Sequence, residues 1–124
     1  MTEPYVTDLE DMTKVNENFR EVVFTSAHSQ LVVMSIGPRD DIGMETHADV
    51  DQMLYVVRGM GIAVLAGRHY EFHKGSVICV PAGTAHNIVN SDDEPLKLFT
   101  VYSPAEHAPG TVQKSKPAEH RAGR

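Results

Sequence analysis

The chain has 124 residues, of which 41% are hydrophobic and 23% are charged, and its formal net charge is −6. This length is enough for one domain with a core of its own, and no apolar run approaches the roughly 20 residues that span a bilayer. The acidic balance argues against nucleic acid or a membrane surface as a partner, because such binding depends on basic patches.

Cys79 is the only cysteine, which excludes an intrachain disulfide and a cysteine-rich metal site. It lies in the short apolar run 76–80, so we expect it to be a small buried side chain. Residues 1–10 are neither basic nor apolar enough for a secretory signal. We therefore expect a cytoplasmic protein.

The first 20 residues are polar and predict an N-terminal arm with a short helix near 8–16. Residues 21–103 carry eight short runs typical of β-strands, separated by glycine, proline and asparagine at close spacing. These runs are 22–26, 30–36, 52–57, 62–66, 69–72, 77–80, 85–89 and 96–102. The pattern predicts one all-β domain, a sandwich or a small barrel. Residues 104–124 lack periodicity and predict a C-terminal tail that is partly disordered.

One of these runs, Leu31-Val-Val-Met-Ser-Ile36, is apolar on both faces instead of alternating. A strand of a small β protein buries one face in the core, so its second apolar face needs another cover. A second copy of the chain would provide that cover. We therefore expect a homodimer.

Residues 75–90 combine a short apolar strand, a turn with proline and glycine, and a second strand that begins near His86. Because side chains alternate along a strand, His86, Ile88 and Asn90 share one face. One histidine is thereby held close to a turn on a rigid sheet, which suits a metal ligand at the mouth of a barrel. A lone histidine in a strand is also commonly a hydrogen-bonded structural residue, so this alternative stays open.

A second polar cluster precedes the strand 52–57 and contains His47, Asp49, Asp51 and Gln52. Imidazole, carboxylate and amide oxygen are all ligand types for divalent metals. His47 and Asp49 are two residues apart, so in a strand they point to the same face. Gln52 has the opposite parity and joins them only if a turn or bulge intervenes before it.

The register of this strand decides which side chain faces inward. If Gln52 faces inward, Leu54 and Val56 line the interior beside it and Met53 faces outward. A slip by one residue would make Asp51 the ligand instead. We expect the register with Gln52 inside.

These two segments resemble the two histidine-containing motifs of the cupins, which are small β-barrels. The second motif is complete in this chain and consists of Gly75, Pro81, Gly83, His86 and Asn90. The first is a variant that runs from His47 to Gly59, with Asp49 in place of the second histidine and Gln52 in place of the glutamate. The similarity to single-domain bacterial cupins covers nearly the whole chain. It implies an RmlC-like double-stranded β-helix, or jelly-roll barrel.

The resemblance and the residues together predict one metal centre and a pocket beside it. The predicted ligands are His47, Asp49, Gln52 and His86, and the predicted pocket residues are Leu54, Val56, Ile88 and Asn90. Two histidines with one carboxylate resemble a non-haem Fe(II) site, but Mn, Zn, Ni and Co accept the same ligands. The identity of the divalent metal therefore stays open. The alternative is that the polar groups lie on the surface and the histidines are satisfied by hydrogen bonds.

Two functions are compatible with such a centre. The first is a metal-dependent enzyme, an isomerase, lyase or dioxygenase, that acts on a small polar molecule. The catalytic residues are not identified, because neither Gln52 nor Asn90 titrates, which leaves a metal-bound hydroxide or Tyr102 as the base. The second is a barrel that binds or senses a small molecule without turnover.

Overall fold

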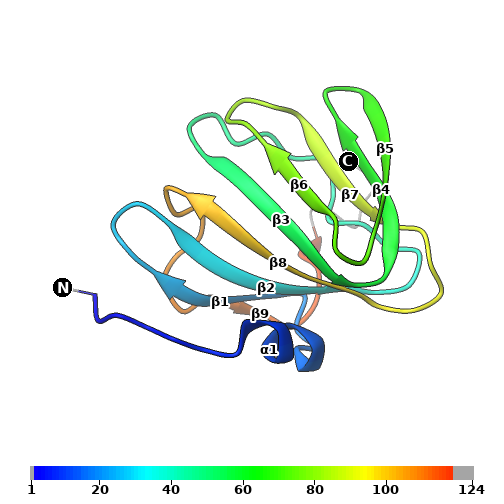
Figure 1. The fold of residues 1–124 in the computed structure, drawn as a ribbon. Helices are drawn as coiled ribbons and strands as arrows, with labels where there is room; N and C mark the ends of the chain where they lie inside the picture. Colours follow the sequence, from blue (N-terminus) through cyan, green and yellow to red (C-terminus); the bar gives the residue numbers. More distant parts are fainter. Residues whose placement is uncertain (1, 119–124) are drawn as a thin grey trace.

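The computed structural model describes residues 2–118, which fold almost entirely into β-strands (Figure 1). One short helix in this part of the chain, α1 (Leu9–Val15), precedes β1 (Arg20–Thr25) and β2 (Gln30–Ile36). The remaining strands are β3 (Asp51–Arg58), β4 (Met60–Leu65), β5 (Arg68–His73), β6 (Val77–Val80), β7 (His86–Asn90), β8 (Leu96–Ser103) and β9 (Val112–Gln113). Each of the eight predicted strands is present close to its predicted bounds. The all-β prediction is therefore confirmed.

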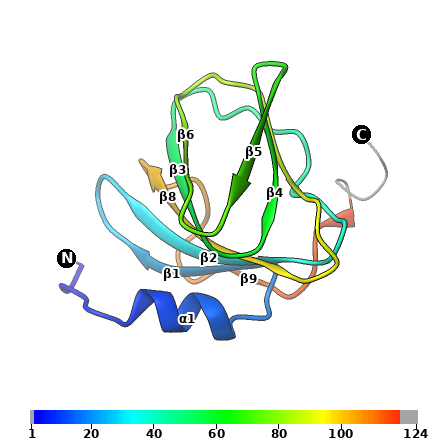
Figure 2. The same ribbon diagram turned by 45° about the vertical axis from the view of Figure 1, so that its right-hand side comes forward.

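Two antiparallel sheets face each other and enclose the core (Figures 1 and 2). The larger sheet has the order β6-β3-β8-β2-β1-β9, and the smaller sheet has the order β5-β4-β7. Both sheets contribute to the core, in which Met34, Leu54, Ile88 and Leu98 are at most 1% exposed. Pairing between strands far apart in the sequence, in two packed sheets, is the jelly-roll arrangement that was predicted.

Strand β3 has the register that the sequence predicts. Gln52, Leu54 and Val56 are at most 3% exposed, whereas Met53 is 51% exposed. Val57 departs from the alternation and is also buried, because the pairing of β3 with β8 shifts by one residue between Val56 and Arg58. The pattern of side chains inside the barrel is thus fixed by alternation up to this bulge.

Helix α1 confirms the predicted short helix and also covers part of the larger sheet. It begins after Asp8, whose carboxylate accepts a hydrogen bond of 3.1 Å from the backbone N–H of Asp11. The helix contacts β2, β3 and β8 and lies beneath the larger sheet in Figure 2. Val33, on the outer face of β2, is only 1% exposed. The outer face of this strand is therefore covered within one chain. No helix in residues 2–118 is long and apolar enough to cross a bilayer.

The expectation that Cys79 is buried is wrong. Strand β6 alternates, with Ile78 and Val80 in the core and Val77 and Cys79 exposed. The run is apolar on both faces, so hydrophobicity alone could not tell the inner face from the outer one.

The segment after β8 packs against the barrel instead of leaving it. The side-chain oxygen of Gln30 accepts hydrogen bonds from the backbone N–H groups of Glu106 and His107, at 3.2 and 3.0 Å. Strand β9 pairs with β1, and the Lys116 ammonium is 3.2 Å from the carboxylate of Asp40. Residues 104–118 are thus part of the folded unit, and the predicted disorder of 119–124 lies outside the described residues.

Candidate metal centre

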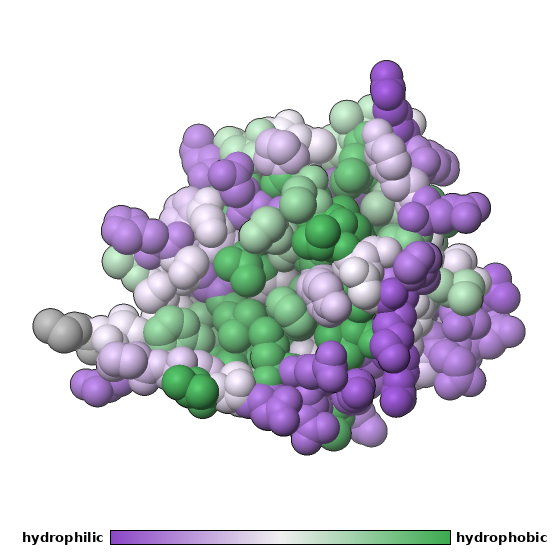
Figure 3. All heavy atoms as spheres, in the orientation of Figure 1, coloured by the Kyte–Doolittle hydropathy of each residue, from purple (hydrophilic) through white to green (hydrophobic). Residues whose placement is uncertain are grey.

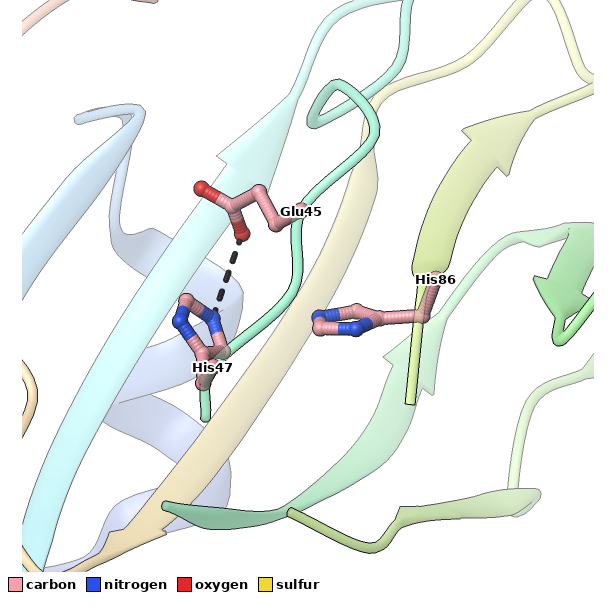
Figure 4. Close-up of side chains that lie close together, drawn as sticks. All are labelled: Glu45, His47 and His86. Atoms are coloured by element: carbon pink, nitrogen blue, oxygen red, sulfur yellow. Dashed lines mark ion pairs between the residues drawn. The ribbon is translucent and has the colours of Figure 1, made fainter. Parts of the chain in front are cut away.

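Three side chains that could ligate a metal lie together inside one end of the barrel (Figure 4). Glu45, His47 and His86 each offer one ligand atom, and these atoms lie within 4.8 Å of one another. A backbone bridge sets this arrangement, since the N–H of Glu45 donates to the carbonyl of His86 at 2.8 Å and the reverse bond is 2.9 Å. The segment between β2 and β3 is thereby held against the start of β7.

His86 is oriented by a hydrogen bond within its own turn. The ring is 3% exposed, and its Nδ1 lies 2.8 Å from the backbone carbonyl of Thr84. A carbonyl only accepts, so Nδ1 carries the proton and Nε2 is the unprotonated nitrogen. Nε2 is buried and has no hydrogen-bond partner. This is the orientation that a backbone carbonyl typically gives a metal-ligating histidine.

His47 lies between two carboxylates. Its Nδ1 is 3.3 Å from Glu106, and its Nε2 is 3.5 Å from Glu45, an ion pair drawn in Figure 4. The carboxylate of Glu45 beside Nε2 raises the pKa of His47 against the effect of burial, and the charge of Glu106 adds to the rise. Burial raises the pKa of Glu45, but the bond to His47 and the nearby positive charge outweigh it, so this pKa is lowered. Glu45 is thus ionised at neutral pH and is ready to bind a cation.

Gln52 adds a third buried acceptor to the same end of the barrel. Its amide Nε2 donates to the hydroxyl of Thr100 at 3.0 Å, while its Oε1 is buried without a partner. Gln52 pairs across the sheet with Tyr102, whose ring centroid is 5.9 Å from that of His47. Within residues 2–118, the buried side-chain atoms of metal-ligand type without a hydrogen-bond partner are therefore Oε1 of Gln52 and Nε2 of His47 and His86.

A divalent cation fits this donor set. An orphaned buried acceptor costs about 1–3 kcal/mol, and three of them at one end of one barrel are unusual for a natural protein. A cation between Glu45, His47 and His86 would give both ring nitrogens a partner, and the carboxylate of Glu45 would supply negative charge. Imidazole, carboxylate and amide oxygen together suit a transition metal better than calcium or magnesium.

The structure brings together some of the predicted ligands and not others. His47 and His86 belong to the cluster, and Gln52 faces the interior. Asp49 lies outside the cluster, on an exposed turn at 48–49. Asp51 is exposed as well, and its carboxylate accepts a hydrogen bond of 2.8 Å from the backbone N–H of Ala82.

The sequence analysis missed Glu45. It treated the residues from His47 onward as a strand and paired His47 with Asp49, but β3 begins only at Asp51. The same spacing of two residues, applied in the other direction, would have paired His47 with Glu45. Only the backbone bridge between Glu45 and His86 shows which direction is right.

The predicted pocket residues have mainly structural roles. Leu54, Val56 and Ile88 belong to the hydrophobic core. The side-chain amide of Asn90 donates to three backbone carbonyls at 2.9–3.1 Å, and its oxygen accepts from the backbone N–H of Asp92. Asn90 therefore fixes the chain around the start of the loop after β7.

Tyr102 and His107 border the cluster. Tyr102 is 1% exposed, and its hydroxyl is 3.4 Å from Nε2 of His107. Burial raises the pKa of Tyr102 well above its ordinary value and lowers that of His107 to about 4. Both side chains are therefore neutral at pH 7. The other described histidines outside this region, His28, His69 and His73, are exposed.

Comparisons with known proteins agree with this architecture. Residues 32–102 match the family described as "Cupin domain". The uncharacterized protein YrkC of Bacillus subtilis is 40% identical over 119 residues, which are 91% of this chain, and the chain spans 64% of the length of YrkC. An uncharacterized protein of Acanthamoeba polyphaga mimivirus is 40% identical over 123 residues, 96% of this chain and 77% of that protein. The crystal structure of BH2720 from Bacillus halodurans superposes with a TM-score of 0.88 at 39% identity, covering 90% of this chain and 89% of the other.

Proposed function

We propose that this chain, which belongs to the cupin family, binds one divalent transition-metal ion through Glu45, His47, Gln52 and His86. The observation that supports this proposal is the cluster of Glu45, His47 and His86, whose ligand atoms lie within 4.8 Å of one another and whose buried ring Nε2 atoms have no hydrogen-bond partner. Glu45 takes the place that the sequence analysis gave to Asp49, because Asp49 is exposed on its turn.

Hydrogen bonds around the cluster support the same assignment. The carbonyl of Thr84 accepts from Nδ1 of His86, and Glu106 lies beside Nδ1 of His47, so the Nε2 atoms of both rings are left for a cation that Glu45 would share. Such outer contacts commonly orient histidine ligands and raise their basicity. The ligand types accept iron, manganese, cobalt, nickel or zinc, and the proposal does not choose among them.

We propose that the bound metal serves an enzyme that acts on a small polar molecule, as an isomerase, a lyase or a dioxygenase. When bound, such an ion polarises a carbonyl or hydroxyl group of a substrate. Solvent reaches the edge of the cluster, since the side chains of Glu45 and Glu106 are 17% and 31% exposed. Tyr102, whose ring centroid is 5.9 Å from that of His47, carries a neutral hydroxyl that could donate a hydrogen bond to a substrate.

One observation favours the alternative of a binding barrel without catalysis. Tyr102 and His107 both have pKa values that keep them neutral at pH 7, so neither exchanges a proton readily near neutrality. A site that lacks a poised base could still bind a small molecule through the metal. Release of product by the metal-loaded protein, against binding without turnover, distinguishes the two functions.

The first test is elemental analysis of untagged protein purified without chelator or nickel resin. The wild type is compared with His86→Ala and with His69→Ala, a control at an exposed histidine. We expect about one equivalent of metal in the wild type and the control, and its loss in His86→Ala. Absence of metal from the wild type, even after reloading with each of the five candidate ions, would contradict the proposal.

We also propose a homodimer that forms through the outer face of the larger sheet. Figure 3 shows hydrophobic side chains gathered over this face, where Met53 and Val77 are 51% and 57% exposed and Cys79 is exposed. Light scattering on a sizing column should report a dimer that Met53→Asp converts to monomer, while Met60→Asp on β4 leaves it intact. A wild type that runs as a monomer would refute the proposed homodimer. The cytoplasmic location stays a prediction.

A further inference from the structure

Arg20 is a buried cation that makes no ion pair with any described residue. It is the first residue of β1, pairs with Met34 of the core, and is 3% exposed. One guanidinium nitrogen donates to the side-chain oxygen of Gln113, and the group lies 5.0 Å from the ring of Phe19. Its Nε is buried without an acceptor. Among the described residues, no carboxylate comes within 4.0 Å of it.

The guanidinium lies on the side of the barrel that holds the candidate metal centre. Its charge helps to lower the pKa of Glu45 and, after burial, is the next contribution that lowers the pKa of His107. Burial raises the pKa of Tyr102, and the charge of Arg20 opposes that rise. Arg20 shares the buried face of β1 with Val22 of the core, so its side chain lies on the inner face of the sheet.

We propose that Arg20 anchors the carboxylate group of a small ligand that binds in the barrel beside the metal ion, an inference that rests on the metal site proposed above. A buried guanidinium N–H without an acceptor is costly, because burial removes its hydration and no hydrogen bond replaces it. A carboxylate would supply that acceptor. The planar guanidinium, with Nε free, presents parallel N–H groups that match the two oxygens of a carboxylate.

The charges around the site favour a ligand with a single negative charge. Glu45 and Glu106 already place two carboxylates there, while Arg20 contributes one positive charge. With a divalent ion bound, the positive charges exceed the negative ones by one, so one carboxylate makes the site neutral. A dianionic phosphate would leave excess negative charge in a buried environment, which is unfavourable. The ligand is thus a small monocarboxylate whose second polar group can reach the metal.

The test measures binding of formate, acetate and lactate to zinc-loaded protein by calorimetry and by the shift in unfolding temperature. Lactamide, which has the shape of lactate without its charge, is the ligand control. The variants are Arg20→Met and Arg20→Lys, with Arg68→Met as the control at an exposed arginine. The zinc content of every sample is measured first.

We expect at least one of the three carboxylates to bind the wild type and Arg68→Met and to raise their unfolding temperatures, while lactamide does neither. Arg20→Met should keep its zinc and weaken carboxylate binding at least about tenfold, the loss expected for a charge-assisted pair. Arg20→Lys keeps the positive charge but loses the planar guanidinium, so its affinity for carboxylate should lie between those of the wild type and Arg20→Met. Arg20→Lys also tests the proposal if Arg20→Met does not fold.

Two outcomes overturn the inference: no carboxylate binds the zinc-loaded wild type, or both Arg20 variants bind carboxylate as tightly as the wild type. Failure of the metal proposal looks different, because the wild type would then hold no zinc. Carboxylate binding to that zinc-free protein, lost in Arg20→Met and kept in Arg68→Met, would still support the subsite.

Discussion

Replacing Gln52 by leucine tests whether the interior of this barrel is built to receive a cation. Gln52 is 3% exposed, its Oε1 has no donor, and its only side-chain hydrogen bond goes to Thr100. Leucine has a similar volume and removes the orphaned oxygen, which relieves about 1–3 kcal/mol, while the lost hydrogen bond costs about 0.5–1.5 kcal/mol. In metal-free protein, Gln52→Leu should therefore change the free energy of unfolding by between a loss of about 0.5 and a gain of about 2.5 kcal/mol.

Gln30 provides a matched control for this substitution. It is 1% exposed, but its amide makes four hydrogen bonds: it donates to Thr25 and to the carbonyl of His107, and it accepts from the N–H groups of Glu106 and His107. Gln30→Leu should lose about 3–5 kcal/mol, because several buried groups are left without partners.

The assay is urea unfolding of both variants and the wild type after removal of metal with a chelator. Equal slopes with denaturant would show that the midpoints can be compared as stabilities. The same Gln52→Leu protein should bind metal at least about tenfold more weakly than the wild type, since a ligand is lost. If Gln52→Leu were as destabilising as Gln30→Leu, the oxygen of Gln52 would be satisfied without metal and the reasoning would be refuted.

Three further substitutions test the frame around the site. Asn90→Ala should lower the free energy of unfolding by about 3–5 kcal/mol in urea, because it removes four hydrogen bonds of a side chain that is 1% exposed; a loss under about 1 kcal/mol would contradict this. Gly61→Ala should cost about 3 kcal/mol or more, since a Cβ there would lie 2.0 Å from the carbonyl oxygen of Val89; a normal melting temperature would show that the strands can separate. Burial lowers the pKa of His107 from 6.5 to about 4 on folding, and Arg20, Glu45, His47 and Tyr102 are the titratable groups near it. Between these two pH values the unfolded chain binds the proton more tightly than the folded one. The stability linked to neutral His107 is therefore complete above pH 6.5 and is lost as the pH falls towards 4. In metal-free protein, His107→Gln should make the free energy of unfolding fall less steeply between pH 6.5 and 4, by up to about 1.4 kcal/mol per pH unit. A pH profile identical to that of the wild type would contradict this prediction.

The sequence predicted the strands because each of them follows a simple physical rule. Glycine and proline end the runs, and in β3 the alternation of Gln52, Leu54 and Val56 with Met53 specifies the inner face. Where a run is apolar on both sides, the rule does not apply. Cys79 was assigned to the wrong face of β6 for this reason, and the outer face of β2 turned out to be covered by α1.

The ligand set was harder to predict, because it depends on contacts between segments. His86 and Gln52 lie on strands, so alternation placed both of them inside. Glu45 and His47 lie in an irregular segment, where no period relates sequence distance to direction. Their positions follow from the bridge to β7, a pairing that no local pattern specifies.

The distribution of unsatisfied groups carries the argument about function. In the described part of the chain, the buried side-chain atoms without a hydrogen-bond partner come from Arg20, His47, Gln52 and His86. All of them lie inside the barrel, and each costs about 1–3 kcal/mol, against a total stability of about 5–15 kcal/mol for a domain. Gln30 and Asn90, equally buried, satisfy every polar atom of their side chains, so the fold does not lack ways to pair such groups. A cation opposite the three acceptors and an anion opposite Arg20 would remove the whole penalty. Ligand binding should therefore raise the stability of this protein more than any repacking of its core.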